Sequence, residues 1–218
     1  MLVPVFPPEL CQNILDLCYD RRSLSACSLT CRAWEKWARR RLFEAVKLTK
    51  VDHCLSFVAI LKSSVSAGTN IRDYVRTVSF SSYGYARPKW RDAARWAFRH
   101  LPNIVSLHLT FCNYNELVAW ASCDEQVDIN AASRSIGSLF SSSKISSLSI
   151  SWVSFKSWED FWTLCTCFPC LTRLELGDME FDQPLQPEHP VLEFPVLKTR
   201  RSSYVVYHGI YSSFVYDR

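Results

Sequence analysis

A phrase of the form apolar-x-x-apolar-x-apolar recurs five times along the chain, and no other feature limits the possible folds as much. In the last half of each copy, apolar residues alternate with polar ones, which is typical of a short strand with one buried face. The copies start at residues 43, 75, 104, 145 and 171, so their spacings are 32, 29, 41 and 26 residues. They are Phe43/Val46/Leu48, Val75/Val78/Phe80, Ile104/Leu107/Leu109, Ile145/Leu148/Ile150 and Leu171/Leu174/Leu176.

Helical patterns fill the intervals between these copies. Asp52 is placed to cap one helix, Pro88 suits the first turn of another, and Ser157-Trp158-Glu159-Asp160 resembles a capping box. Pro169 follows the last of these helices, as expected for a stop. The predicted helices carry Leu55, Val58 and Leu61; Trp90, Ala94, Ala97 and Leu101; Ile136, Leu139 and Phe140; and Phe161, Leu164 and Phe168.

Strands that alternate with helices define an α/β fold class. Because the phrase returns in the same phase, the pattern favours an irregular leucine-rich-repeat-like β/α solenoid, in which neighbouring units cover each other's apolar faces. A compact α/β domain with a parallel sheet uses the same alternation and stays open as the alternative.

The segment before the repeats is predicted to form three short helices. Pro7-Pro8 precedes the first helix, and Ser23 is predicted to cap the second. So few residues make a poor independent core, and the surplus of apolar side chains indicates a partner. An ordinary three-helix start to a globular domain has the same periodicity. The apolar positions are Leu10, Ile14, Leu17 and Cys18; Leu24, Cys27, Leu29 and Cys31; and Trp34, Trp37, Ala38 and Leu42.

The order of these N-terminal residues resembles an F-box, most closely the F-box-like form of mushroom-forming (basidiomycete) fungi. The resemblance rests on Pro8-Glu9-Leu10, Ile14-Leu15, Leu24, the run from Leu29 to Trp34, and the run from Leu42 to Leu48. Thr30 and Cys11 depart mildly from the family pattern. The resemblance implies docking to a Skp-type adaptor, and some of the matching residues could instead hold the helices together. The matching residues are Pro8, Leu10, Ile14, Leu15, Leu24, Cys27, Cys31 and Trp34.

The expected organisation is an F-box-like domain at 3–48, a degenerate leucine-rich-repeat region at 49–182 and an atypical C-terminal segment at 183–218. Phe194-Pro195-Val196-Leu197 reads as the entry to a sixth unit, but Arg200 and Ser202 break its pattern. The resemblance implies the substrate-recognition subunit of an SCF-type ubiquitin ligase, linked through the adaptor to cullin and RING subunits, with the repeats binding a target protein. The alternatives are an F-box interaction module outside a ligase, and a truncated receptor without target binding.

The charge distribution separates the two parts of the chain. Residues 1–50 hold nine Lys and Arg against five Asp and Glu, whereas residues 51–218 hold sixteen of each. A neutral body argues against a nucleic-acid binder, and a local basic patch can steer an acidic protein partner. Arg39-Arg40-Arg41, with Lys36, is interpreted as the solvated face of the third helix rather than as a nuclear-import patch, because a triplet is shorter than such patches.

Cysteine usage and missing motifs limit the chemistry. No secretory signal precedes the ten cysteines, which favours reduced thiols in the cytoplasm or nucleus. No apolar run reaches the length of a membrane-spanning helix. Cys165-x-Cys167-x-x-Cys170 lacks a nearby fourth ligand, so neither a metal nor another cofactor is expected. Without a nucleophile elbow or phosphate loop, we expect no enzyme, the alternative being an active site assembled from dispersed residues.

Aromatic residues are dense, with eight Trp and thirteen Phe. Trp152 directly follows the predicted strand Ile145–Ile150, where a solenoid exposes its binding loops. An exposed Trp is a common anchor in protein recognition, so Trp152 is the predicted target-binding residue. The alternative is that such rings fill irregular spaces between the repeats.

Overall fold

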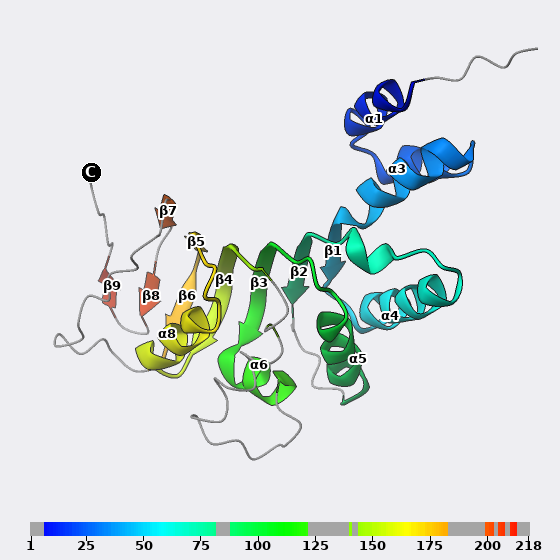
Figure 1. Ribbon diagram of the computed structural model, residues 1–218. Coiled ribbons are helices and arrows are strands. Elements are labelled where there is room, and N and C mark those ends of the chain that lie inside the picture. The colour runs from blue at the N-terminus through cyan, green and yellow to red at the C-terminus, as the bar shows by residue number, and fades with distance from the viewer. Residues whose placement is uncertain are drawn as a thin grey trace, which may run out of the picture.

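The computed structural model describes residues 7–81, 88–121, 140, 144–182, 199–202, 205–207 and 210–212. They form an α/β fold around one sheet, which is parallel except for its last strand pair (Figure 1). The coarse α/β prediction is therefore confirmed. The three N-terminal helices stand beyond the first strand, at one end of the sheet (Figure 1).

Helices α1 (Pro8–Asp16), α2 (Arg21–Ser28) and α3 (Arg32–Glu44) make up this N-terminal three-helix unit. Pro8 stands in the first turn of α1, where a missing N–H costs nothing. Asp20 caps α2, since its carboxylate accepts hydrogen bonds from the Ser23 amide at 2.8 Å and the Ser23 hydroxyl at 2.9 Å. The prediction that Ser23 is the cap was wrong, because the carboxylate three residues earlier takes that role.

All five repeated phrases form strands, as predicted. Each strand begins at the second apolar residue of its phrase or one residue earlier. They are β1 (Ala45–Leu48), β2 (Thr77–Ser81), β3 (Ser106–Asn113), β4 (Ser147–Phe155) and β5 (Arg173–Leu176). Shorter strands follow at β6 (Met179–Phe181), β7 (Thr199–Ser202), β8 (Val205–Tyr207) and β9 (Ile210–Ser212).

The strands lie side by side in chain order from β1 to β4, and each pairs in parallel with the next. Strand β4 then pairs with β5 along its first half and with β6 along its second half. Further out, β7 pairs with β5, β8 pairs with β6, and β9 runs antiparallel to β8. The register places equivalent apolar residues on one rung of the ladder, for example Val46, Val78, Leu107, Leu148 and Leu174.

The ladder continues into the C-terminal segment although the apolar phrase does not. Arg200 lies opposite Leu174, and Ser202 lies opposite Leu176, in the phase that the sequence predicts for a sixth unit. Because backbone groups form the ladder, polar residues at these positions do not prevent the pairing.

Helices α4 (Val51–Ser66), α5 (Pro88–Arg99), α6 (Tyr114–Ala121) and α8 (Trp158–Thr166) lie along the same side of the sheet (Figure 1), and the short 3-10 helix η1 (Ile71–Asp73) precedes β2. The capping box of α8 is confirmed: the Asp160 amide donates to the Ser157 hydroxyl at 3.3 Å, and the Ser157 amide donates to the Asp160 carboxylate at 3.2 Å. Helix α4 lies where it was predicted, but Lys50 rather than Asp52 is its N-cap, and Leu55 is exposed instead of facing the core.

The predicted helix around Ile136 and Leu139 lies outside the described residues, but Phe140 is helical and buried. The ring of Phe140 meets that of Phe98 edge to face at 5.2 Å.

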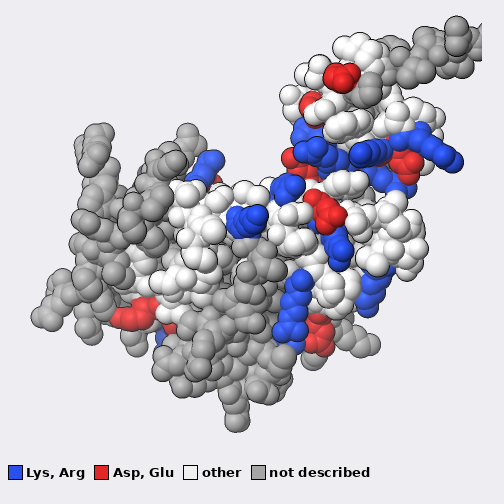
Figure 2. Space-filling model, viewed as in Figure 1, with Lys and Arg blue, Asp and Glu red and all other residues white. Residues whose placement is uncertain are grey.

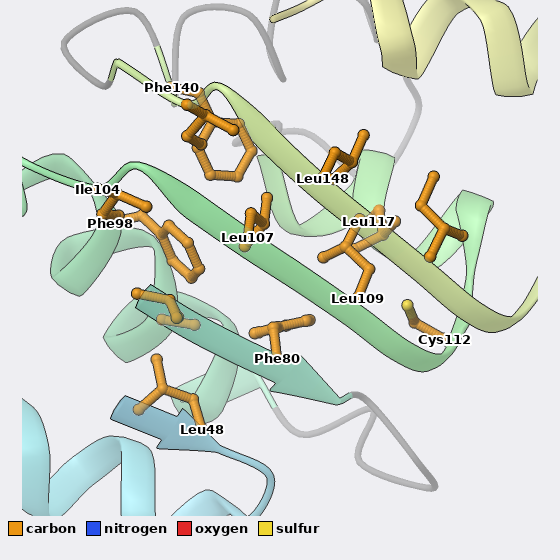
Figure 3. Close-up of a cluster of buried hydrophobic side chains, with 14 of the residues drawn as sticks. Leu48, Phe80, Phe98, Ile104, Leu107, Leu109, Cys112, Leu117, Phe140 and Leu148 are labelled. Carbon is orange, nitrogen blue, oxygen red and sulfur yellow. The ribbon is translucent and has the colours of Figure 1, made fainter. Parts of the chain in front are cut away.

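One continuous core joins the sheet to its helices, from Val46 to Phe181. Figure 3 shows side chains of neighbouring strands, such as Leu48, Phe80 and Leu107, gathered on the helical side of the sheet. A second, separate cluster of buried residues lies within the three-helix unit. Among the described helices, none has both the length and the apolar character to cross a membrane.

Candidate docking surfaces

The three-helix unit holds itself together with few residues. Leu15 of α1, Leu24 of α2 and Ala38 of α3 are its buried core. Partly buried side chains surround them: Cys18, Cys27, Trp34, Trp37 and Leu42.

A stripe of apolar side chains on α1 points away from this core. Leu10, Ile14 and Leu17 are spaced by four and three residues, so they share one helical face. They are 47%, 39% and 72% exposed, and elsewhere on the same unit Tyr19 and Leu29 are 84% and 85% exposed. Isolated apolar side chains on a surface are ordinary, but a stripe on a unit of this size is typical of a docking surface.

The eight residues predicted to contact an adaptor fall into two groups. Leu15 and Leu24 are buried and hold the helices together, and Cys27 and Trp34 pack partly buried against them. Leu10, Ile14 and Cys31 are exposed. Pro8 is the first residue of α1, and its side chain is not among those that the structure describes.

The predicted adaptor contacts did not include Leu17, Tyr19 and Leu29, which are the most exposed large apolar residues in the described part of the chain. Leu17 shares the spacing of the α1 stripe, which was the available signal. Leu29 was assigned to the apolar face of α2, but this helix ends at Ser28 and Leu29 follows it.

The basic residues of this unit are partly engaged with neighbouring groups. Arg41 bonds Glu44 at 2.7 Å and Asp16 of α1 at 3.4 Å, Arg39 bonds Glu35 at 2.7 Å, and Arg40 lies 5.9 Å above the Trp37 ring. The predicted solvated face of the third helix is therefore only partly exposed at Arg39 and Arg41, which form these ion pairs. Exposed basic side chains remain at Arg21, Arg22, Arg32 and Lys36, and Figure 2 shows Lys and Arg gathered over this end of the molecule.

The second surface is the face of the sheet opposite to the helices. Its central outward positions carry small hydroxylated side chains, so this face is low and polar. The exception is His108, whose Nε2 lies 3.2 Å from the Ser106 hydroxyl. The hydroxylated residues are Thr77, Ser79, Ser106, Thr110, Ser147, Ser149, Ser151 and Ser154, all partly exposed.

Two aromatic rings stand out from this polar face. Trp152 and Phe111 lie on one rung, between the pairs Thr110–Ser151 and Cys112–Val153. Their rings stack at 5.8 Å with 12° between planes, and they are 56% and 46% exposed. Trp152 is exposed, as an anchor should be, but the prediction that it follows the strand was wrong: β4 continues to Phe155.

Both rings sit on a backbone kink. Phe111 has a φ of 50° and Trp152 a φ of 56°, a region that costs a residue with a side chain about 1–3 kcal/mol. The kink shifts the in-out alternation by one position, so the next buried residues, Cys112 and Val153, come three positions after Leu109 and Ile150. For this reason, the regular alternation of apolar and polar residues in the sequence stops at Ile150, although β4 continues to Phe155.

None of the nine described cysteines forms a disulfide, and Cys123 lies outside the described residues. Burial raises the pKa of Cys54 to about 12 and also raises that of Cys165. A raised thiol pKa opposes nucleophilic chemistry. Cys31 and Cys170 are exposed.

Polar groups inside the core are similarly shifted. Tyr114 is buried, burial raises its pKa, and its hydroxyl has no hydrogen-bond partner among the described atoms. Burial also raises the pKa of Asp160 in the capping box. The described part of the chain contains no group of three His, Cys, Asp or Glu side chains that could hold a metal ion.

No protein-family model matches the chain, and no curated protein matches it. The function must therefore be argued from the two surfaces themselves. One is an apolar stripe with basic residues nearby, on a unit with its own small core. The other is a low hydroxylated sheet face with one stacked aromatic pair.

Proposed function

We propose that the chain is the substrate-recognition subunit of an SCF-type ubiquitin ligase, with residues 3–48 forming an F-box that docks a Skp-type adaptor. The observation that carries this proposal is the exposed stripe Leu10, Ile14 and Leu17. Burying a large apolar side chain contributes about 1.5–3 kcal/mol. Because Leu10, Ile14 and Leu17 are partly buried already, covering the stripe would contribute on the order of 2–5 kcal/mol before association costs are subtracted.

The basic residues support the same partner. Arg21, Arg22, Arg32 and Lys36 are exposed on the unit that carries the stripe. An acidic adaptor would be drawn to this end by long-range attraction, which raises the rate of association more than the final affinity.

The body is proposed to be an irregular leucine-rich-repeat-like solenoid that presents the target-binding surface. Strands in chain order, with helices on one side, support this interpretation over a doubly wound sheet, whose helices cover both faces. The Ser/Thr face opposite to the described helices, with Trp152 and Phe111, would hold the target. The chain would act by proximity, holding a target lysine near a ubiquitin thioester carried by another subunit.

Capture of a purified Skp-type adaptor by the purified full chain tests the F-box. The double variant Leu10→Asp/Leu17→Asp should abolish capture, because it places two charges in the apolar contact. The matched control Leu55→Asp/Val65→Asp changes two apolar residues of α4 that are 41% and 55% exposed, and it should retain capture. Equal capture by both double variants would refute the F-box.

A second measurement separates a ligase subunit from an interaction module outside a ligase. The chain should capture the same amount of adaptor whether or not the adaptor is pre-assembled with cullin, because the proposal places cullin on the far side of the adaptor. Loss of capture when cullin is present would favour the module outside a ligase.

A further inference from the structure

The aromatic pair on the sheet face has a position that neither backbone preference nor burial explains. Phe111 and Trp152 adopt positive φ values, which glycine or asparagine adopts with less strain. Both rings remain about half exposed after they stack on one another. Large aromatic residues in such a place indicate a role at the surface.

The described neighbours of the rings on β3 and β4 are small. On β3 and β4, the outward residues before the pair are the small Thr110 and Ser151. The next rung outward carries Asn113 and Ser154. Among the described residues of β3 and β4, the two rings therefore project beyond their neighbours.

An acidic residue, Asp178, lies beside Trp152 in the link between β5 and β6. Between the pairs Ile150–Leu176 and Val153–Met179, the register brings Asp178 opposite Trp152, and the Trp152 amide donates a hydrogen bond to the Asp178 carbonyl. Glu180 lies opposite Ser154 on the next rung and is exposed. No Lys or Arg occurs at 111–113, 152–154 or 178–180.

We propose that Trp152 and Phe111, with Asp178 and Glu180, form a site for an arginine side chain in an extended basic segment of a partner protein. A planar guanidinium can lie on an aromatic face while its N–H groups donate to a carboxylate. Arginine suits this combination better than lysine, because its flat cation stacks and forks at the same time. The partner is the target of the proposed function, and this inference rests on that function only in naming it so.

Fluorescence anisotropy of a labelled nonapeptide with arginine at alternate positions and serine between them tests the site, using the full chain. The peptide should bind, its lysine version more weakly, and its citrulline version, which is neutral but similar in shape, at least about fivefold more weakly. Equal binding of the arginine and citrulline peptides, or no binding of either, would overturn the proposal. So would binding of a neutral oligosaccharide in place of the arginine peptide.

Variants locate the binding. Trp152→Ala and the pair Asp178→Asn/Glu180→Gln should each weaken the arginine peptide at least about fivefold. Tyr19→Ala and Asp52→Asn are matched controls, because they remove an exposed ring and an exposed carboxylate elsewhere, and they should leave binding unchanged. Unchanged binding by Trp152→Ala, with folding verified by circular dichroism, would refute the site.

The same variants separate this inference from the proposed function. Trp152→Ala should still capture the adaptor, since it lies on the sheet and not on the three-helix unit. If the unmodified chain binds the arginine peptide but does not capture the adaptor, the proposed ligase function is refuted and the proposed arginine site is retained.

Discussion

Gly177 has no room for a side chain in the sheet. It lies between β5 and β6, where β4 exchanges one partner strand for the other, and its amide donates to the Ile150 carbonyl at 2.7 Å. A Cβ on Gly177 would lie 2.4 Å from the Ser151 Oγ and 2.9 Å from the Ser151 Cβ. Rotation of the hydroxyl relieves only the first contact, so a larger residue must push the strands apart.

Gly177→Ala should lower the free energy of unfolding by about 1–3 kcal/mol, measured by urea denaturation, because overpacking forces the backbone to shift. Ser151→Gly removes both contacting side-chain atoms. The double variant should therefore cost less than the sum of the single variants. Strictly additive costs would show that the Ser151 contact is not the cause.

At the scale of elements, the three-helix unit differs from the rest of the chain in how its stability arises. Its buried cluster is separate from the main core, and its chain connection is the direct passage from α3 into β1. A unit with so small a core has little stability of its own and can open while the sheet stays folded.

Leu24→Ala should destabilise the three-helix unit by about 2–5 kcal/mol, because it leaves a cavity in its core. Hydrogen exchange should then show lost amide protection in α1–α3 with protection retained in β2–β4. Leu29→Ala is the matched control: this leucine is 85% exposed, and its removal should change stability by no more than about 0.5 kcal/mol. Equal loss of protection in the strands would show that unit and sheet unfold together.

Strands were easier to predict than helix starts, for a physical reason. Side chains along a strand alternate between its two faces, so burial of one face gives a two-residue apolar period. The five phrases show this period and located five strands. Helix starts depend on which of several nearby polar groups reaches the first amides. Ser157 was predicted correctly because Asp160 completes a reciprocal pair, whereas Asp20 displaced Ser23, and Lys50 rather than Asp52 precedes α4.

At the scale of the whole molecule, one core runs through the sheet and its helices, and ionisable groups are buried along it. Cys54 of α4, Tyr114 of α6 and Cys165 of α8 all have pKa values raised by burial. A group that stays neutral in the folded state but ionises in the unfolded chain makes stability depend on pH across the whole core.

The free energy of unfolding should fall as pH rises above about 9. For Cys54, the unfolded thiol ionises near its ordinary pKa of 9.0, and the folded thiol keeps its proton until about 12. The stabilisation is thus complete below pH 9 and is lost as pH rises toward 12. Urea midpoints from pH 7 to 11 should fall less steeply in Cys54→Ala than in the unmodified chain. Cys170→Ser, at an exposed thiol, should leave the slope unchanged.

The sequence by itself determined where the five repeated strands lie and which residues of the five phrases face the core, because apolar spacing along a strand reports burial directly. It did not predict β7, because Arg200 and Ser202 break the apolar pattern, whereas the backbone ladder continues through both residues. In the N-terminal segment it identified three helices and the apolar residues that they share.

Only the tertiary structure decided which of those apolar residues are core and which are surface. Leu15 and Leu24 meet α3, whereas Leu10 and Leu17 face outward, and helical spacing alone does not distinguish neighbouring stripes of one helix. The tertiary structure also decided the position of Trp152. A kink shared by β3 and β4 shifts the alternation by one residue and stacks Trp152 on Phe111, a residue 41 positions away in the chain, because the two strands pair rung by rung.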